Sequence, residues 1–171
     1  GFYLGHEPSG YATQVYDLTE YLNYGAENLL TVRVDASTEE GWYYEGAGIY
    51  RDVWLEKMSL VHVAPFGTFV TSHITDSYKA ADVNIEVRLS NKGLEPANCT
   101  VVNRVLDATG REVVSKQKSD ITLAPKQEEV KLLQSVKMND IHLWNLEQPY
   151  LYTLYTDVYV GEKLVDTYST N

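Results

Sequence analysis

The sequence predicts an all-β protein, and three observations lead to that prediction. Apolar residues alternate with polar ones in several segments, which is the two-residue period of a strand with one buried face. No window sustains a helical apolar stripe for more than about two turns. Turn residues recur every ~8–12 positions in residues 60–171. We therefore expect about seven short strands in that region, arranged as an immunoglobulin-like β-sandwich.

Charged and aromatic residues are distributed unevenly along the 171 residues. Residues 1–58 carry 3 basic and 10 acidic side chains, whereas residues 59–171 carry 11 and 14. The first segment also holds 11 of the 20 aromatic residues. Such different surfaces are typical of two domains, so we expect one domain over 1–58 and a second over 59–171. Residues 1–58 hold too few strands to close a sandwich alone, and we expect them to belong to a larger β-domain.

Two elements are expected in residues 1–58. A single helical turn begins at Asp17, whose carboxylate can accept hydrogen bonds from the first backbone amides. A strand covers Leu30, Val32 and Val34, because polar residues occupy the positions between them.

The strands expected in the second segment follow in chain order. The clearest contains Val83, Ile85, Val87 and Leu89 at every second position. The turn residues Asp-Ala-Thr-Gly at 107–110 predict a hairpin between two flanking strands. The remaining strands are expected at 101–106, 112–118, 128–136, 152–160 and 164–168, the last two joined by a turn at 161–162.

The composition excludes several classes of function. A net charge of -10 at pH 7 argues against nucleic acid and anionic membranes as partners, because their phosphates attract Lys and Arg. No segment approaches the roughly 18 apolar residues needed to span a membrane. The single cysteine, Cys99, permits neither an internal disulfide nor a cysteine-ligated zinc site, and we expect it to be a small buried apolar residue. A chain without disulfides is compatible with the cytoplasm or the bacterial periplasm.

The sequence contains none of the common catalytic motifs. It lacks the G-x-S-x-G and H-E-x-x-H motifs and the Gly-rich phosphate-binding loop. Its four histidines are scattered without the spacing of metal ligands. Adjacent Glu39 and Glu40 point apart in a strand or turn, which does not suit paired acid and base catalysis. We therefore expect no catalytic residue, no metal and no cofactor in this chain.

Residues 42–54 form the densest aromatic cluster. Trp42 and Tyr43 precede a Gly-Ala-Gly turn, and aromatic faces can stack on the C–H faces of sugars. Trp42 and Tyr43 are therefore candidate carbohydrate-binding residues. The alternative is packing, with Ile49 and Val53 in a buried strand.

A second cluster, residues 143–152, lies just before an expected strand. Pro149 favours extended backbone at this point, because its ring fixes φ and its nitrogen cannot donate to a sheet. Trp144 is expected to fill one end of the sandwich core.

Several of these segments, in this order, resemble glycoside hydrolase family 2, which includes β-galactosidases, β-glucuronidases and β-mannosidases. The first group of segments, within residues 16–55, is similar to the end of the family's N-terminal sugar-binding jelly-roll domain. The second group, within residues 62–154, is similar to its immunoglobulin-like domain. The overall pattern of these motifs is most similar to that of the β-galactosidase branch. The segments are 16–19, 21–22, 27–34, 42–43 and 46–55 in the first group, and 62–63, 67–70, 143–144 and 147–154 in the second.

The resemblance implies a fold of an immunoglobulin-like β-sandwich preceded by the C-terminal strands of a jelly-roll β-sandwich. It also implies that activity resides in a following TIM barrel, a partner within the same parent chain, where two glutamates hydrolyse a β-glycosidic bond with retention. We expect this chain to end about where such a barrel begins, so neither glutamate maps onto it. An aspartate that some β-galactosidases lend to the substrate pocket is replaced here by Ser9, and nearby His6 and Glu7 are the candidate substitutes.

Two functional hypotheses follow. The first is a non-catalytic fragment of a multi-domain exo-acting glycosidase, which positions the jelly roll against the barrel. The alternative is a stand-alone carbohydrate-binding or adhesion module that uses the cluster around Trp42. Unpaired strand edges in residues 1–58 leave the oligomeric state open.

Overall fold

The computed structural model describes residues 1–35, 37, 48–75 and 77–171. The chain divides into two compact units, Gly1–Trp54 and Leu55–Asn171. No helix long and apolar enough to cross a membrane occurs in the described ranges.

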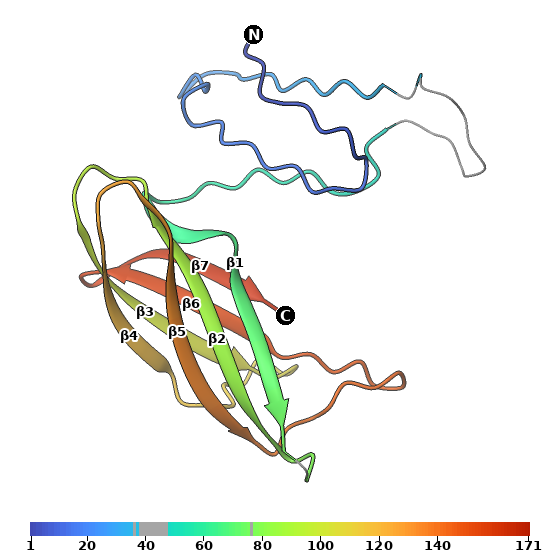
Figure 1. Cartoon of the computed structure of the whole chain (residues 1–171), viewed down its shortest axis with the longest axis vertical. Helices are drawn as coiled ribbons and strands as arrows, with labels where there is room; N and C mark the ends of the chain where they lie inside the picture. Colours follow the sequence, from blue (N-terminus) through green and yellow to red (C-terminus); the bar gives the residue numbers. More distant parts are fainter. Residues whose placement is uncertain (36, 38–47, 76) are drawn as a thin grey trace. The chain divides into compact units, whose positions relative to one another are not determined.

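All of the strands that the structure describes lie in the second unit (Figure 1). There are seven of them, the number expected from the sequence. In chain order they are β1 (Val61–Ile74), β2 (Ala80–Asn91), β3 (Ala97–Leu106), β4 (Gln117–Leu123), β5 (Gln127–Asn139), β6 (Thr153–Val160) and β7 (Lys163–Thr170).

The seven strands form two antiparallel sheets. One sheet has the order β1-β2-β5 and the other β4-β3-β6-β7. The sheets face each other as the two layers of a sandwich, as Figure 1 shows. The prediction of an all-β, immunoglobulin-like sandwich is confirmed.

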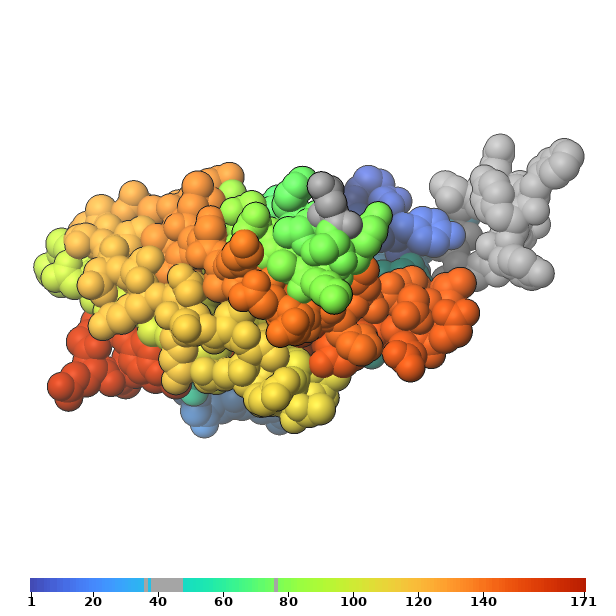
Figure 2. All heavy atoms as spheres, turned by 90° about the horizontal axis from the view of Figure 1, so that it is seen from below, coloured from blue at the N-terminus to red at the C-terminus, as the bar shows by residue number. Residues whose placement is uncertain are grey.

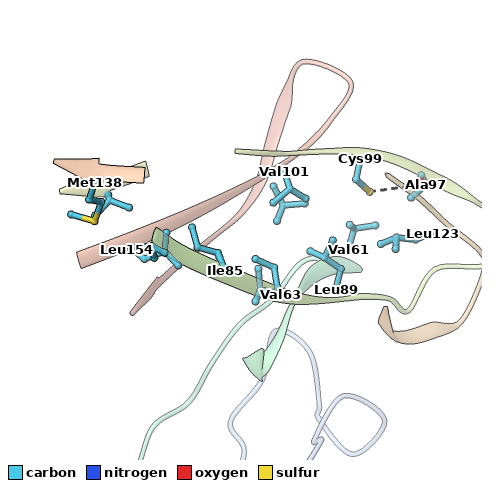
Figure 3. Packing of buried hydrophobic residues seen from close by; sticks show 14 of the residues in the cluster. Val61, Val63, Ile85, Leu89, Ala97, Cys99, Val101, Leu123, Met138 and Leu154 are labelled. Carbon is cyan, nitrogen blue, oxygen red and sulfur yellow. Dashed lines mark hydrogen bonds between the residues drawn. The ribbon is translucent and has the colours of Figure 1, made fainter. Parts of the chain in front are cut away.

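The core lies between the sheets, and on β2 and β3 every second residue points into it. On β2, Val83, Ile85, Val87 and Leu89 are all buried, as their alternation predicted. Figure 3 shows side chains from both sheets facing one another in this layer. Cys99 is 2% exposed within it, so its prediction as a small buried residue is confirmed. The core side chains labelled in Figure 3 are Val61, Val63, Ile85, Leu89, Ala97, Cys99, Val101, Leu123, Met138 and Leu154.

A buried polar network crosses the core and joins the two sheets. Asn103 on β3 donates its amide hydrogen to Gln134 on β5, over 2.8 Å. Thr156 on β6 donates its hydroxyl hydrogen to Asn103, over 2.5 Å. Gln134 in turn donates to Ser119 on β4, over 2.8 Å. Buried amides require such partners, so the network fixes which strands face each other.

The ladder between β1 and β2 contains a pronounced bulge. Val63 pairs with Leu89, and the next pair is Thr68 with Val87, so four residues of β1 lie opposite Arg88 alone. A side chain of the partner strand stabilises the bulge, because the Arg88 guanidinium donates a hydrogen bond to the Phe66 carbonyl over 2.9 Å.

Two of the expected strands differ from the structure. The hairpin turn at 107–110 forms, but the returning strand β4 begins at Gln117 rather than at 112. Before it, only an isolated bridge joins Leu106 to Glu112. The later start of β4 has its reason in Asp107. The Asp107 carboxylate accepts a hydrogen bond from the Arg111 amide, and this bond extends the turn before strand pairing resumes.

The second difference concerns the first unit, which has no strand among its described residues. Leu30, Val32 and Val34 are exposed. Alternation indicates a strand only if another strand is available to pair with it, and no described residue of this unit pairs with them. Near Asp17 the backbone makes one hydrogen-bonded turn, from the Tyr21 amide to the Leu18 carbonyl over 2.9 Å, and Asp17 accepts from the Thr19 amide over 3.0 Å.

Candidate functional site

The predicted carbohydrate-binding residues lie in the first unit. His6 and Glu7 are both exposed, and the Glu7 carboxylate accepts a hydrogen bond of 3.4 Å from the Ser9 amide. Trp42 and Tyr43 fall outside the described residues. Their role in binding sugar therefore stays a prediction.

Two carboxylates are buried among the described residues, and both are engaged by the fold. Asp157 on β6 accepts from the Arg104 guanidinium over 2.9 Å and from the Thr167 hydroxyl over 3.0 Å. The hydrogen bond to Asp157 raises the pKa of Arg104 above its ordinary value. Asp107 accepts four hydrogen bonds inside the turn after β3. Asp157 thus joins β6 to its two neighbours, β3 and β7, whereas Asp107 closes its own turn.

The turn at Asp107 makes the stability of the sandwich depend on pH. Hydrogen bonds from the Thr109 hydroxyl and the Arg111 amide lower the pKa of Asp107 from 3.8 to about 2. A group with a lowered folded-state pKa stabilises the fold fully above its unfolded pKa and loses that contribution as pH falls toward the folded pKa. The stabilising effect of Asp107 should therefore disappear between about pH 4 and about pH 2.

An Asp107→Asn variant tests this pH dependence. We expect wild type to exceed the variant in free energy of unfolding at about pH 5, and the difference to shrink steadily toward about pH 2. Urea denaturation followed by circular dichroism at each pH measures the difference. A difference that stays constant across this range would contradict the assignment.

The described residues hold no group of three or more His, Cys, Asp or Glu side chains that could bind a metal ion. Two open hollows occur on the surface of the second unit. One, of about 440 Å³, lies over β3 and β4, where Thr100 donates to Asp120 over 2.5 Å and Thr122 donates to Asn98 over 2.8 Å. The other, of about 400 Å³, includes Asp166. Its carboxylate accepts from the Val63 amide over 2.7 Å.

A third surface feature is the connection between β5 and β6, residues 140–152, which we call the arm. It is the orange segment that projects from the sandwich at the lower right of Figure 1. The backbone turns into it at Asp140, which has a φ of 52°, and Asp is one of the residues that tolerate this conformation. The Ile141 amide then donates to the Lys79 carbonyl over 3.1 Å, which fixes the base of the arm to the sandwich.

Aromatic rings stiffen the base of the arm. The rings of His142 and Tyr150 lie 4.7 Å apart, and those of Tyr150 and Tyr152 lie 5.2 Å apart. The Tyr152 hydroxyl accepts from the His142 amide over 2.8 Å. The Tyr150 hydroxyl accepts from the Ala108 amide over 3.3 Å, so the arm is also tied to the turn after β3.

Asn145 organises the tip of the arm. Its side-chain oxygen accepts from the amides of Glu147, over 3.0 Å, and Gln148, over 2.7 Å. Its own amide donates to the Gln148 carbonyl over 3.2 Å. These bonds form a closed turn in which the side chain substitutes for missing backbone partners.

The arm presents apolar side chains to solvent. Trp144 is 55% exposed and Leu146 is 84% exposed, and Leu143 and Leu151 are exposed beside them. In Figure 2 the orange atoms of this segment stand out at the right-hand end of the sandwich. The expectation that Trp144 fills one end of the core is therefore wrong.

The sequence does indicate that the apolar residues of the arm lie in a loop, although their hydrophobicity alone suggests that they are buried. Apolar residues at 141–152 do not alternate, unlike those at 83–89 on β2. Asn145 and Pro149 are residues typical of turns and loops. Together they indicate an ordered loop that carries apolar side chains, rather than a strand that buries them.

Residues 55–171 thus define an immunoglobulin-like β-sandwich with a stiff, apolar arm. The chain belongs to the glycosyl hydrolases family 2, whose family model matches residues 61–171.

Three known proteins illustrate the similarity. A β-galactosidase of Bacteroides ovatus, BoGH2A, is 41% identical over 171 residues, which cover 99% of this chain and 20% of that protein. The structure of a family 2 β-glucuronidase has a TM-score of 0.84 at 25% identity, over 91% of this chain and 18% of that one. A family 2 member from Bacteroides cellulosilyticus has a TM-score of 0.83 at 27% identity, over 90% of this chain and 21% of that one. The chain therefore spans about a fifth of the length of the proteins it matches.

Proposed function

We propose that this chain is a non-catalytic part of a longer glycoside hydrolase, and that it holds other domains of that enzyme in place. Residues 1–58 would belong to the jelly-roll sugar-binding domain, and residues 59–171 form the immunoglobulin-like spacer. The activity would reside in a TIM barrel elsewhere in the parent polypeptide. We further propose a retaining β-galactosidase as the parent.

One observation carries the proposal: the family match covers the sandwich, while the chain spans only about a fifth of relatives named as hydrolases. The chemistry of the chain agrees with it. Both buried carboxylates among the described residues bind arginine and hydroxyl groups of the fold, which leaves them unsuited to attack a glycosidic bond.

Hydrolysis assays test the proposal. The purified 171-residue chain should give no saturable hydrolysis of an aryl β-galactoside, because a retaining glycosidase needs two carboxyl groups about 5 Å apart around the substrate. The product of the complete reading frame that contains these residues should hydrolyse it. Saturable turnover by the chain alone, or a reading frame without a barrel, would contradict the proposal.

The choice of sugar is tested in the same experiment. Relatives at similar coverage are named β-galactosidase and β-glucuronidase. An aryl β-glucuronide is therefore the control substrate for the parent enzyme. Preference for the β-galactoside by at least tenfold in kcat/KM is expected, and preference for the glucuronide would move the parent to the other class.

The alternative of a stand-alone carbohydrate-binding module rests on Trp42 and Tyr43. Calorimetric titration of the 171-residue chain with a galactoside decides it. Binding that Trp42→Ala abolishes, in a chain whose reading frame ends without a barrel, would favour the alternative.

A further inference from the structure

The arm combines two properties that rarely occur together in a loop. Its backbone and its aromatic base are tied down by specific contacts, including those of Tyr150, Tyr152 and Asn145. Its apolar side chains at Trp144 and Leu146 nevertheless lie in water. A loop that only connected β5 and β6 would need neither feature, since loops are ordinarily polar and mobile.

The order of the arm favours binding. A segment that is already rigid loses little conformational freedom when a partner covers it, so more of the burial energy remains as affinity. Trp is among the side chains enriched at the buried centres of interfaces, and the exposed leucines around Trp144 add apolar area to the same surface. The arm therefore has the character of a preformed contact surface.

The charge of the arm indicates the chemistry of its partner. The arm contains two acidic residues, Asp140 at its base and Glu147 at its tip, and no Lys or Arg. An ionic or nucleic-acid partner has little to bind here. The complementary surface must be apolar.

The area of the arm selects among apolar partners. Its four exposed apolar residues are far fewer than the roughly 20–30 residues per partner of a typical stable interface. Two copies joined through their arms alone would thus be held weakly. A domain of the same polypeptide needs less area, because the covalent connection supplies an effective concentration in the millimolar range.

We propose that the arm is an intramolecular docking element, on which Leu143, Trp144, Leu146 and Leu151 seat an apolar patch of another domain of the parent polypeptide. This inference rests on the proposed function, since it requires a longer parent. It adds the surface through which the sandwich holds that domain.

Thiol labelling tests the inference. Cys99 is 2% exposed, and burial raises the pKa of its thiol, so it reacts slowly. A cysteine introduced by Leu146→Cys is expected to react readily in the 171-residue chain, and at least tenfold more slowly in the parent polypeptide. Labelling with a maleimide, located by peptide mass spectrometry, measures both rates.

Leu94→Cys is the matched control. Leu94 is 74% exposed in the connection between β2 and β3, away from the arm. Its labelling rate is expected to be the same in the chain and in the parent. Equal protection of both cysteines would contradict a specific role of the arm.

The remaining outcomes separate this inference from the proposed function. An active parent in which the cysteine of Leu146→Cys reacts as fast as in the chain overturns the docking role and leaves the proposed function standing. A reading frame without further domains overturns both. Protection in the 171-residue chain that rises with concentration, with a dimer mass in light scattering, would assign the arm to a second copy and overturn the inference.

Discussion

Replacing Asn103 by leucine is expected to lower the free energy of unfolding by about 2–4 kcal/mol, although the two side chains have the same number and branching of heavy atoms. Asn103 gives a hydrogen bond to Gln134 and receives one from Thr156, and all three side chains are buried. Leucine can do neither. Two buried polar groups would then lack a partner, each at a cost of roughly 1–3 kcal/mol.

Urea denaturation followed by far-ultraviolet circular dichroism measures this loss. Tryptophan fluorescence is less suitable, because Trp54 and Trp144 are exposed. Asn98→Leu is the matched control: it lies on the same strand, but its side chain is at the surface, where it accepts from Thr122. We expect the control to change stability by no more than about 0.5 kcal/mol.

A double-mutant cycle identifies the cause. Asn103→Leu combined with Gln134→Leu removes both amides of the central pair, so the second change should cost less in the presence of the first. Independent effects of the two substitutions would show that the contact across the sheets does not couple them. A fully stable Asn103→Leu variant would contradict the role of the network.

The strand β2 could be predicted because Val83, Ile85, Val87 and Leu89 alternate strictly with polar residues. The polar network could not be recognised in the same way, since Asn103 and Gln134 interrupt apolar series on β3 and β5. A polar residue at an inward position signals a buried partner, but the sequence does not say on which strand the partner lies. Only the packing of the two sheets brings these amides together.

The arm shows a second limit of prediction from the sequence. Hydrophobicity indicates that Trp144 will be covered, but not by what, and the sandwich alone leaves it exposed. The same limit applies to Leu30, Val32 and Val34, which pair with no strand among the residues that the structure describes. Apolar residues at the surface and apolar residues in the core look alike in a sequence. His6 and Glu7 were placed by resemblance alone, and their role in binding stays a prediction.

The second large effect is expected at Gly67, in the bulge between β1 and β2. A Cβ atom at this position would lie 2.4 Å from the Ala64 carbonyl oxygen and 2.9 Å from the Arg88 carbonyl oxygen. Both contacts are with backbone, which cannot move aside as a flexible side chain can. Gly67→Ala should therefore displace the bulge and lower the free energy of unfolding by about 2–4 kcal/mol.

Phe66→Gly is the neighbouring control, and it separates crowding from a general sensitivity of the bulge. Phe66 is 63% exposed and has a φ of 54°, a conformation that glycine adopts without strain. Removing its side chain should leave stability within about 1 kcal/mol of wild type. If Gly67→Ala were as stable as wild type, the close approach of the two backbones would be relieved at little cost. The bulge would then be a flexible joint, rather than the fixed bend that sets the register from Thr68 onward.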